Sequence, residues 1–191
     1  MSIIVSALPV SEASALIPQL AGLLQHVVDG GAALGFLAPL SPEGATAYWQ
    51  EVVQDLEAGP RLLLVARHAE TNEVLGTVQL DPATRPNGLH RAEVAKMMVH
   101  SKARRQGIGR QLLQALETQA RQLGRTTLVL DTREGDVAEP LYQGMGYQRA
   151  GRIPDYARSS DGTLHATVVY YKLLGAEAES STAALSPNPS K

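Results

Sequence analysis

A short loop with two spaced glycines and three arginines constrains this chain more than any other stretch. Residues 104–110 read Arg-Arg-Gln-Gly-Ile-Gly-Arg, between an apolar, strand-like run over 94–99 and an amphipathic, helix-like pattern over 111–123. The first turn of a helix has unpaired N–H groups and the positive end of the helix dipole. Glycines there let a phosphate approach the backbone closely. The segment therefore predicts a strand–loop–helix junction that binds a phosphate or pyrophosphate.

Two familiar phosphate-binding patterns do not fit this loop. A Walker loop requires Gly-Lys-Ser or Gly-Lys-Thr, and neither occurs in the chain. A dinucleotide fingerprint requires a third glycine at the position that Leu112 occupies. Asp131 does match the acidic residue of that fingerprint, so a Rossmann-type oxidoreductase is kept as a distant alternative. A purely structural role for Gly107 at the start of a helix is another.

Composition excludes several classes of protein. The chain has 191 residues, a net charge of −2 and only 4% aromatic residues, which disfavours nucleic-acid binding. It has no cysteine, so disulfides, thiolate metal sites and a cysteine nucleophile are excluded, and a reducing cytoplasm fits. Its histidines lack metal-ligand spacing, and no metal is expected. Neither a signal peptide nor an apolar run of the roughly 20 residues that span a bilayer is recognisable.

Periodicity and turn residues predict an alternation of strands and helices. Ser41 and Pro42 form an N-cap and N1 pair, whereas Pro18 predicts a kink or a late start of the first helix. Strands are predicted over 3–8, 61–68, 74–80, 91–100, 128–130, 147–153 and 167–173, and helices over 12–28, 42–56, 111–123 and 137–145. A meander of strands followed by β–α alternation predicts an α/β chain with a mixed sheet and helices on its faces, not a doubly wound parallel sheet.

Two motifs at matching spacing carry a family resemblance. Arg104, Gly107 and Gly109 follow the fourth predicted strand, and Tyr142-Gln143-Gly144-Met145-Gly146-Tyr147 follows the fifth. Together they resemble the GCN5-related N-acetyltransferase (GNAT) family. The resemblance implies a seven-stranded, mostly antiparallel sheet flanked by helices on both faces and splayed between strands 4 and 5. Residues 1–174 would form this single domain, with residues 175–191, rich in Ala, Glu, Ser and Pro, as a disordered tail.

The resemblance also implies a donor and its binding residues. The donor is acetyl-CoA, whose pyrophosphate would be held by main-chain N–H groups of the glycine loop. Its pantetheine arm would pair with the edge of the fourth strand, while the methionine side chains there pack in the core. The implied cofactor-binding residues are Met97, Met98, Val99, Arg104, Arg105, Gln106, Gly107, Ile108, Gly109 and Arg110.

Three catalytic residues are carried over from the family pattern. An alkyl ammonium has a pKa near 10, so a carboxylate that takes its proton is useful at neutral pH. Glu93 and Asp131, on the fourth and fifth strands, are the candidate base and ammonium-binding residues; these two duties are not separated. Tyr142 matches the acid that protonates the leaving thiolate. The alternatives are a solvent-facing Glu93, an Asp131 that caps the next turn, and a Tyr142 that only packs.

A narrower resemblance concerns the acceptor. Residues 30–36, 85–93, 130–135 and 162–167 look like the tabtoxin-resistance type of acetyltransferase, which inactivates a β-lactam amino-acid toxin. This implies a small amino-acid-like amine, and the long loops predicted over 81–90 and 155–164 would crowd a cleft for larger acceptors. A peptide or protein N-terminus, a polyamine, and a non-catalytic acyl-CoA sensor are the alternatives. Family members are often homodimers, so a homodimer is also possible. Gly135 replaces an asparagine that contacts the cofactor in many members.

Overall fold

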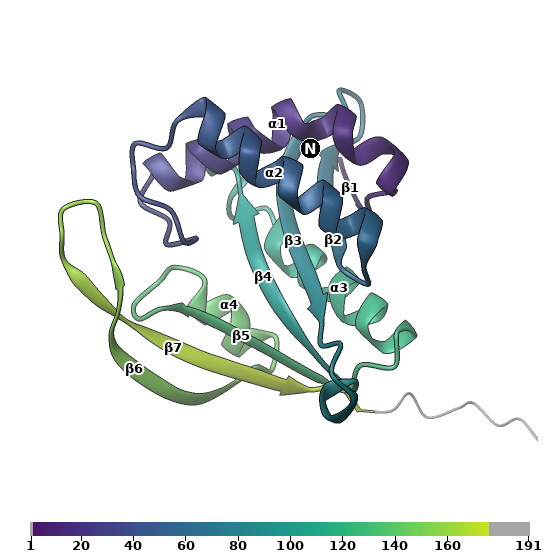
Figure 1. Ribbon diagram of the computed structural model, residues 1–191, viewed down its shortest axis with the longest axis vertical. Helices are drawn as coiled ribbons and strands as arrows, with labels where there is room; N and C mark the ends of the chain where they lie inside the picture. Colours follow the sequence, from purple (N-terminus) through teal and green to yellow (C-terminus); the bar gives the residue numbers. More distant parts are fainter. Residues whose placement is uncertain (1, 176–191) are drawn as a thin grey trace, which may run out of the picture.

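A computed structural model describes residues 2–175 and shows one seven-stranded sheet with helices on both faces (Figure 1). The strand order is β1-β2-β3-β4-β5-β7-β6, and every neighbouring pair is antiparallel except β4 and β5, which are parallel. The strands are β1 Ile3–Ala7, β2 Leu62–His68, β3 Val74–Pro82, β4 Arg91–Val99, β5 Thr127–Arg133, β6 Gln148–Arg158 and β7 Leu164–Leu173. The α-helices are α1 Val10–Asp29, α2 Pro42–Ala58, α3 Ile108–Gln122 and α4 Glu139–Gly144. The predicted fold class is confirmed.

Alternation along the strands divides the core between the two faces of the sheet. Leu63 and Val65 of β2 pack with α1 and α2, whereas Leu64 and Ala66 of the same strand pack with α3. Side chains of a strand point to opposite faces in turn, so one apolar strand serves both layers. Figure 1 shows α1 and α2 in front of β1–β4, with α3 behind them.

Two local predictions about the helices had different outcomes. Ser41 caps α2 as predicted, because its Oγ accepts a hydrogen bond of 3.0 Å from the Gly44 N–H. Of the two alternatives predicted from Pro18, a kink or a late start, the late start does not occur: α1 begins at Val10 and continues through Pro18. Pro18 lies on the exposed face of α1, where water can solvate the carbonyl that its ring leaves unpaired. No helix within residues 2–175 combines the length and apolarity that a membrane crossing needs.

The last hairpin is longer than predicted. Strands were predicted over 147–153 and 167–173, with a loop over 155–164, but β6 reaches Arg158 and β7 begins at Leu164. Pro154 and Asp155 lie where the β6–β7 register shifts between Ile153 and Ala157, so a proline there costs no ladder hydrogen bond. The predicted tail lies outside the described residues, apart from Gly175.

Candidate active site

A bulge in β4 opens the sheet at its centre. Thr77 of β3 faces Met98, but Gln79 faces Ala95, so β4 has one extra residue in this interval. Lys96 lies inside the bulge with φ of 49°, a left-handed conformation. A bulge of this kind bends its strand and increases the local twist. Pairing between β4 and β5 ends at Glu93 and Val129, and beyond this point the two strands diverge (Figure 1).

The predicted cofactor edge lies on the diverging part of β4. Within residues 2–175, no residue of β4 beyond Glu93 has a strand partner on the β5 side. Met98 is 3% exposed and packs with α1 and α2, as expected for its side chain, whereas Met97 and Val99 are half-buried. The edge of β4 is therefore available for an extended ligand whose amides pair with a strand.

The glycine loop leads from this edge into α3. Arg105 and Gly107 have φ of 59° and 79°, and the helix begins at Ile108. Within the described part of the chain, none of the main-chain N–H groups from Arg105 to Arg110 has an acceptor. Consecutive unpaired N–H groups at the start of a fifteen-residue helix form an anion-binding nest. The predicted strand–loop–helix junction is confirmed, with the helix starting three residues earlier than its apolar pattern suggested.

The structure requires glycine at positions 107 and 109 of the loop for two different reasons. Gly107 has a left-handed conformation, and a Cβ there would have only Gln111 Nε2 nearby, at 3.9 Å. At Gly109, a Cβ would lie 2.8 Å from Met97 Cε and 2.9 Å from Leu141 Cδ2. From the sequence, both glycines were explained by the close approach of a phosphate to the backbone. At Gly109 the structure adds a packing constraint, because α3 passes closely over β4 and α4 at this point.

Two arginine side chains of the loop have partners within the protein. Arg104 Nε donates to the Val99 carbonyl at 3.3 Å, and Arg110 Nη1 lies 3.2 Å from Met145 Sδ. Arg105 is exposed and has no hydrogen bond within residues 2–175. The loop therefore offers an anion its main-chain N–H groups together with a local positive charge.

The two predicted carboxylates lie on the two strands that diverge. Burial raises the pKa of Glu93, and the carboxylates of Asp131 and Asp81 raise it further. Asp131 Oδ2 lies 2.8 Å from Thr167 Oγ1 of β7, which also lies 2.8 Å from the Thr132 carbonyl. Thr167 is 3% exposed, so it holds the Asp131 carboxylate from a fixed position. The Thr167 contact replaces the predicted alternative of a turn cap for Asp131. Asp131 lies close enough to Glu93 for its charge to raise the pKa of Glu93, but both residues are exposed, as the alternative of a solvent-facing Glu93 requires.

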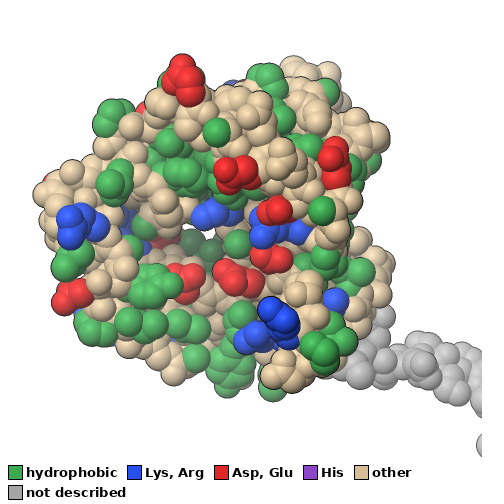
Figure 2. All heavy atoms as spheres, viewed as in Figure 1, with side chains coloured by type: hydrophobic (Ala, Val, Ile, Leu, Met, Phe, Trp, Pro, Cys, Tyr) green, Lys and Arg blue, Asp and Glu red, His purple; other side chains and the backbone are tan. Residues whose placement is uncertain are grey.

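A third carboxylate, Asp81, lies beside Glu93 and was missed by sequence reasoning. Arg61 Nη2 forms an ion pair of 2.7 Å with Asp81, and Arg61 Nη1 pairs with Asp55 at 2.8 Å. A pocket of about 340 Å³ opens where β3, β4 and β5 meet. Its lining residues are Asp81, Pro82, Ala83, Thr84, Arg91, Ala92, Glu93 and Val129. Figure 2 shows acidic and basic side chains gathered around the hollow between the two halves of the molecule.

Tyr142 lies in α4, beneath the diverging strands. Its ring is 6% exposed and stands 5.9 Å from the Tyr147 ring and 6.2 Å from the Tyr170 ring. Burial raises its pKa, with smaller contributions from Asp136 and Asp131. Within residues 2–175, the Tyr142 hydroxyl has no hydrogen-bond partner, and its oxygen is not completely shielded from solvent. The phenol is therefore protonated near neutral pH and its hydroxyl is free to donate.

The loop between α1 and α2 crosses the open end of the cleft. It is tied at three points to three different parts of the sheet. Lys96 Nζ donates to the Leu34 carbonyl at 2.7 Å, Arg133 Nη2 donates to the Gly31 carbonyl at 3.1 Å, and the Ala38 N–H donates to Ser160 Oγ at 2.8 Å. Strands β4 and β5 and the β6–β7 turn are thereby linked above the two carboxylates. No local pattern in the sequence predicted this closure.

An aromatic pair completes the wall of the cleft near Lys96. Phe36 and Tyr48 pack edge to face at 5.2 Å, and Lys96 Nζ lies 5.6 Å and 5.7 Å from their ring centres. Tyr48 hydroxyl accepts from Gln79 Nε2 at 2.9 Å, and burial raises the pKa of Tyr48 to about 12. Trp49 is fully buried in the core. The aromatic residues Phe36, Tyr48 and Trp49 and the lysine in the otherwise apolar run 94–99 were the sequence signals for this feature.

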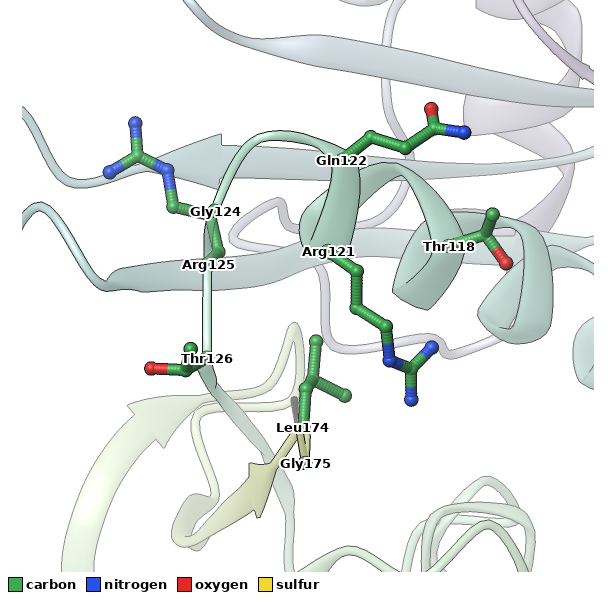
Figure 3. A pocket seen from close by; sticks show the side chains of 8 residues that line it. All are labelled: Thr118, Arg121, Gln122, Gly124, Arg125, Thr126, Leu174 and Gly175. Carbon is green, nitrogen blue, oxygen red and sulfur yellow. The ribbon is translucent and has the colours of Figure 1, made fainter. Parts of the chain in front are cut away.

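A separate hollow of about 230 Å³ lies at the far end of α3 (Figure 3). Its charged lining residues are Arg121 and Arg125, and Figure 3 shows their side chains pointing away from each other. The fifteen residues of α3 span roughly 22 Å, so the glycine loop lies at the opposite end of the helix. The lining contains no carboxylate, and its cations do not converge. This hollow therefore lacks the carboxylates that lie in the cleft between β4 and β5.

Comparison with known proteins places this geometry in a family. Residues 32–147 match the model of the acetyltransferase (GNAT) family. An 87-residue stretch is 37% identical to N-acetyltransferase 8B of Rattus norvegicus, and this match spans 44% of the chain and 39% of that protein.

Solved structures share the fold at low sequence identity. An N-acetyltransferase from Staphylococcus aureus has a TM-score of 0.72 at 20% identity, over 92% of this chain and 100% of the other. A protein from Salmonella typhimurium with its cofactor acetyl-CoA has a TM-score of 0.70 at 18% identity, over 92% and 95% of the two chains. The family model matches residues 32–147, which include the glycine loop and the strands that diverge, so the chain belongs to the acetyltransferase (GNAT) family.

Proposed function

We propose that the protein transfers the acetyl group of acetyl-CoA to the primary amine of a small, amino-acid-like molecule by direct attack. One observation carries the proposal. A strand edge and a nest of unpaired N–H groups, suited to the donor, meet two carboxylates, suited to an amine, at a single gap in the sheet.

The donor side is supported by the continuity of β4 with the glycine loop. The free edge of β4 suits the amides of the pantetheine arm, and the N–H groups of Arg105 to Arg110 suit the pyrophosphate. An N–H of the same edge can hydrogen-bond the thioester carbonyl, whose oxygen gains negative charge during attack. The residues assigned to the donor are those predicted from the sequence, 97–99 and 104–110.

The acceptor side is supported by the carboxylate pair. In the reaction, the ammonium group first gives up one proton to Glu93 or Asp131, directly or through a water molecule. The neutral amine nitrogen then forms a bond to the acetyl carbon, the carbon–sulfur bond breaks, and the nitrogen releases its second proton to water. The raised pKa of Glu93 moves it toward neutral pH, where a general base works best. The thiolate takes a proton from Tyr142, whose raised pKa keeps the phenol protonated until the thiolate forms.

The preference for a small acceptor is supported by the loop over residues 31–40. Its contacts with Lys96, Arg133 and Ser160 cross the end of the cleft through which a peptide would otherwise extend. A loop that crosses from β4 to β5 and the β6–β7 turn obstructs a long acceptor more than a molecule of amino-acid size. The narrower resemblance to the tabtoxin-resistance type agrees with it, and an amino-acid toxin or antibiotic is the acceptor we propose within this class. The absence of cysteine agrees with a cytoplasmic enzyme.

The test is a release assay for CoA with amino acids, amino-acid toxins, polyamines and peptides as acceptors. We expect turnover with small amino-acid analogues and a loss of about 100-fold or more in Glu93→Gln or Asp131→Asn. Glu70→Gln, which neutralises an exposed carboxylate in the β2–β3 turn, is the matched control and keeps the wild-type rate.

Three outcomes would contradict parts of the proposal. Wild-type rates in both cleft variants refute the assignment of the base. Turnover of a peptide but of no small amine refutes the acceptor class. Tight binding of acetyl-CoA in calorimetry, without CoA release across the whole panel, indicates a sensor instead of an enzyme.

A further inference from the structure

Lys96 is a cation in the cleft that the proposed reaction does not use. It lies at the bulge of β4, three residues after Glu93, and its side chain is half-buried. One of its three ammonium hydrogens is donated to the Leu34 carbonyl. Within residues 2–175, Lys96 Nζ has no other hydrogen-bond acceptor and no carboxylate oxygen within 4.0 Å. Two donors of a half-buried ammonium group are therefore available.

The surroundings of Lys96 leave one side of the ammonium group open. The Leu34 carbonyl and the rings of Phe36 and Tyr48 surround it on the wall of the cleft. Asp131 and Glu93 are the carboxylates that act on its charge, and neither closes into an ion pair. Burial lowers the pKa of Lys96, because the ammonium group has lost part of the water that favours its charged form. No ion pair within residues 2–175 replaces that water.

The cleft therefore presents a cation near enough to Glu93 and Asp131 to feel their charges, with no ion pair between the lysine and either carboxylate. An α-amino acid carries the complementary charges, an ammonium group and a carboxylate, within one small molecule. We infer that Lys96 binds the carboxylate of an amino-acid acceptor while Glu93 and Asp131 receive its amine. This inference rests on the proposed acetyl transfer and narrows its acceptor to amino acids with a free carboxylate.

The other cations near the cleft are less suited to this role. Arg61 is held by Asp55 and Asp81, and Arg133, which donates to the Gly31 carbonyl, is not among the charges that act on Glu93. Arg91 lines the pocket beside Glu93 but is exposed, so water competes for its guanidinium group. A half-buried ammonium group gains more from a carboxylate, because a charge-assisted hydrogen bond is stronger where water is excluded.

The experiment compares each L-amino acid with its C-terminal amide, which keeps the amine and lacks the carboxylate. For wild-type protein we expect kcat/KM to favour the free acid. In Lys96→Met, kcat/KM for the acid falls by about 10- to 100-fold, as for loss of a hydrogen bond to a charged group. The value for the amide changes less than threefold, and KM for acetyl-CoA is unchanged. Lys96→Arg keeps a cation and restores most of the preference, while Arg91→Met is the control and leaves it intact.

The outcomes separate this inference from the proposed function. If acid and amide lose activity equally in Lys96→Met, the lysine only holds the loop through Leu34, and the inference is wrong. If Arg91→Met abolishes the preference instead, the carboxylate binds at the other cation. Failure of the proposed function shows differently, as absence of CoA release with every acid and every amide in wild-type protein. Melting temperatures of all variants are measured to exclude unfolding as a cause.

Discussion

Replacement of Gly109 by alanine tests the packing that joins the glycine loop to the reaction site. The new Cβ would lie 2.8 Å from Met97 Cε and 2.9 Å from Leu141 Cδ2. Two carbon atoms in ordinary contact are separated by about 3.5 Å or more, so the two neighbouring atoms have to move by roughly 0.7 Å and 0.6 Å. Overpacking of this kind costs about 1–3 kcal/mol. For a domain of this size, that cost corresponds to a melting temperature lower by about 2–12 °C.

The same displacement reaches the two parts of the site that Gly109 touches. Met97 lies on the free edge of β4, and Leu141 precedes Tyr142 in α4. We therefore expect the dissociation constant for acetyl-CoA, measured by calorimetry, to rise together with the loss of thermal stability. Met97→Ala in the Gly109→Ala background removes the shorter contact. The double variant should lose less stability than the sum of the two single variants, by about 0.5 kcal/mol or more.

Gly107→Ala is the matched control for this experiment. It strains a residue with φ of 79°, at a cost of about 1–2 kcal/mol, without meeting Met97. Met97→Ala should therefore bring no relief in the Gly107→Ala background. A Gly109→Ala protein that melts within about 1 °C of wild type, with unchanged affinity for acetyl-CoA, would show that the contact at Gly109 does not constrain the loop.

Three further predictions concern the acid, the base and the core. Tyr142→Phe should lower kcat by about 100-fold but leave the melting temperature nearly unchanged, because its hydroxyl has no partner to lose; an unaltered kcat in steady-state assays would exclude Tyr142 as the acid. On the acid side of the pH profile, kcat/KM should rise with pH as Glu93 loses its proton. Asp131→Asn removes a charge that raises the pKa of Glu93, so this rise should occur at lower pH in the variant. A rise at the same pH as in wild type would show that the two carboxylates do not interact. Lys172→Met should lower the free energy of unfolding, measured in urea, by about 3–5 kcal/mol. The reason is that Lys172 Nζ lies 2.7 Å from both carboxylate oxygens of Glu117, which is 5% exposed. The double variant Lys172→Met/Glu117→Leu should recover most of this loss.

Much of the fold was predictable because its signals are local. Apolar alternation marks β2 and β3, the Ser41–Pro42 pair marks the start of α2, and the glycine loop marks the junction of β4 with α3. Boundaries were less accurate where a local signal met a tertiary contact. The strand predicted over 147–153 continues to Arg158, because pairing of β6 with β7 resumes at Ala157 after the register shift.

The candidate site was predictable in its residue types but not in its arrangement. Glu93, Asp131 and Tyr142 came from a family pattern, and the structure brings the two carboxylates to the same gap; their catalytic roles stay predictions. Asp81 lies beside Glu93 because β3 pairs with β4, and Thr167 reaches Asp131 because β7 pairs with β5. Neither neighbour is near its partner in the sequence, so no spacing rule could reveal it.

The proposed donor site could be found from the sequence because it is local. An anion-binding nest is built from consecutive residues, 104–110, whose glycines and position before a helix can be read from the chain alone. The proposed acceptor site became visible only in the folded chain. Lys96, Asp131 and the loop over residues 31–40 meet because a bulge separates β4 from β5 and a long loop then crosses the gap. Selectivity for an acceptor depends on side chains brought together from distant parts of the chain, and their distances are set by packing.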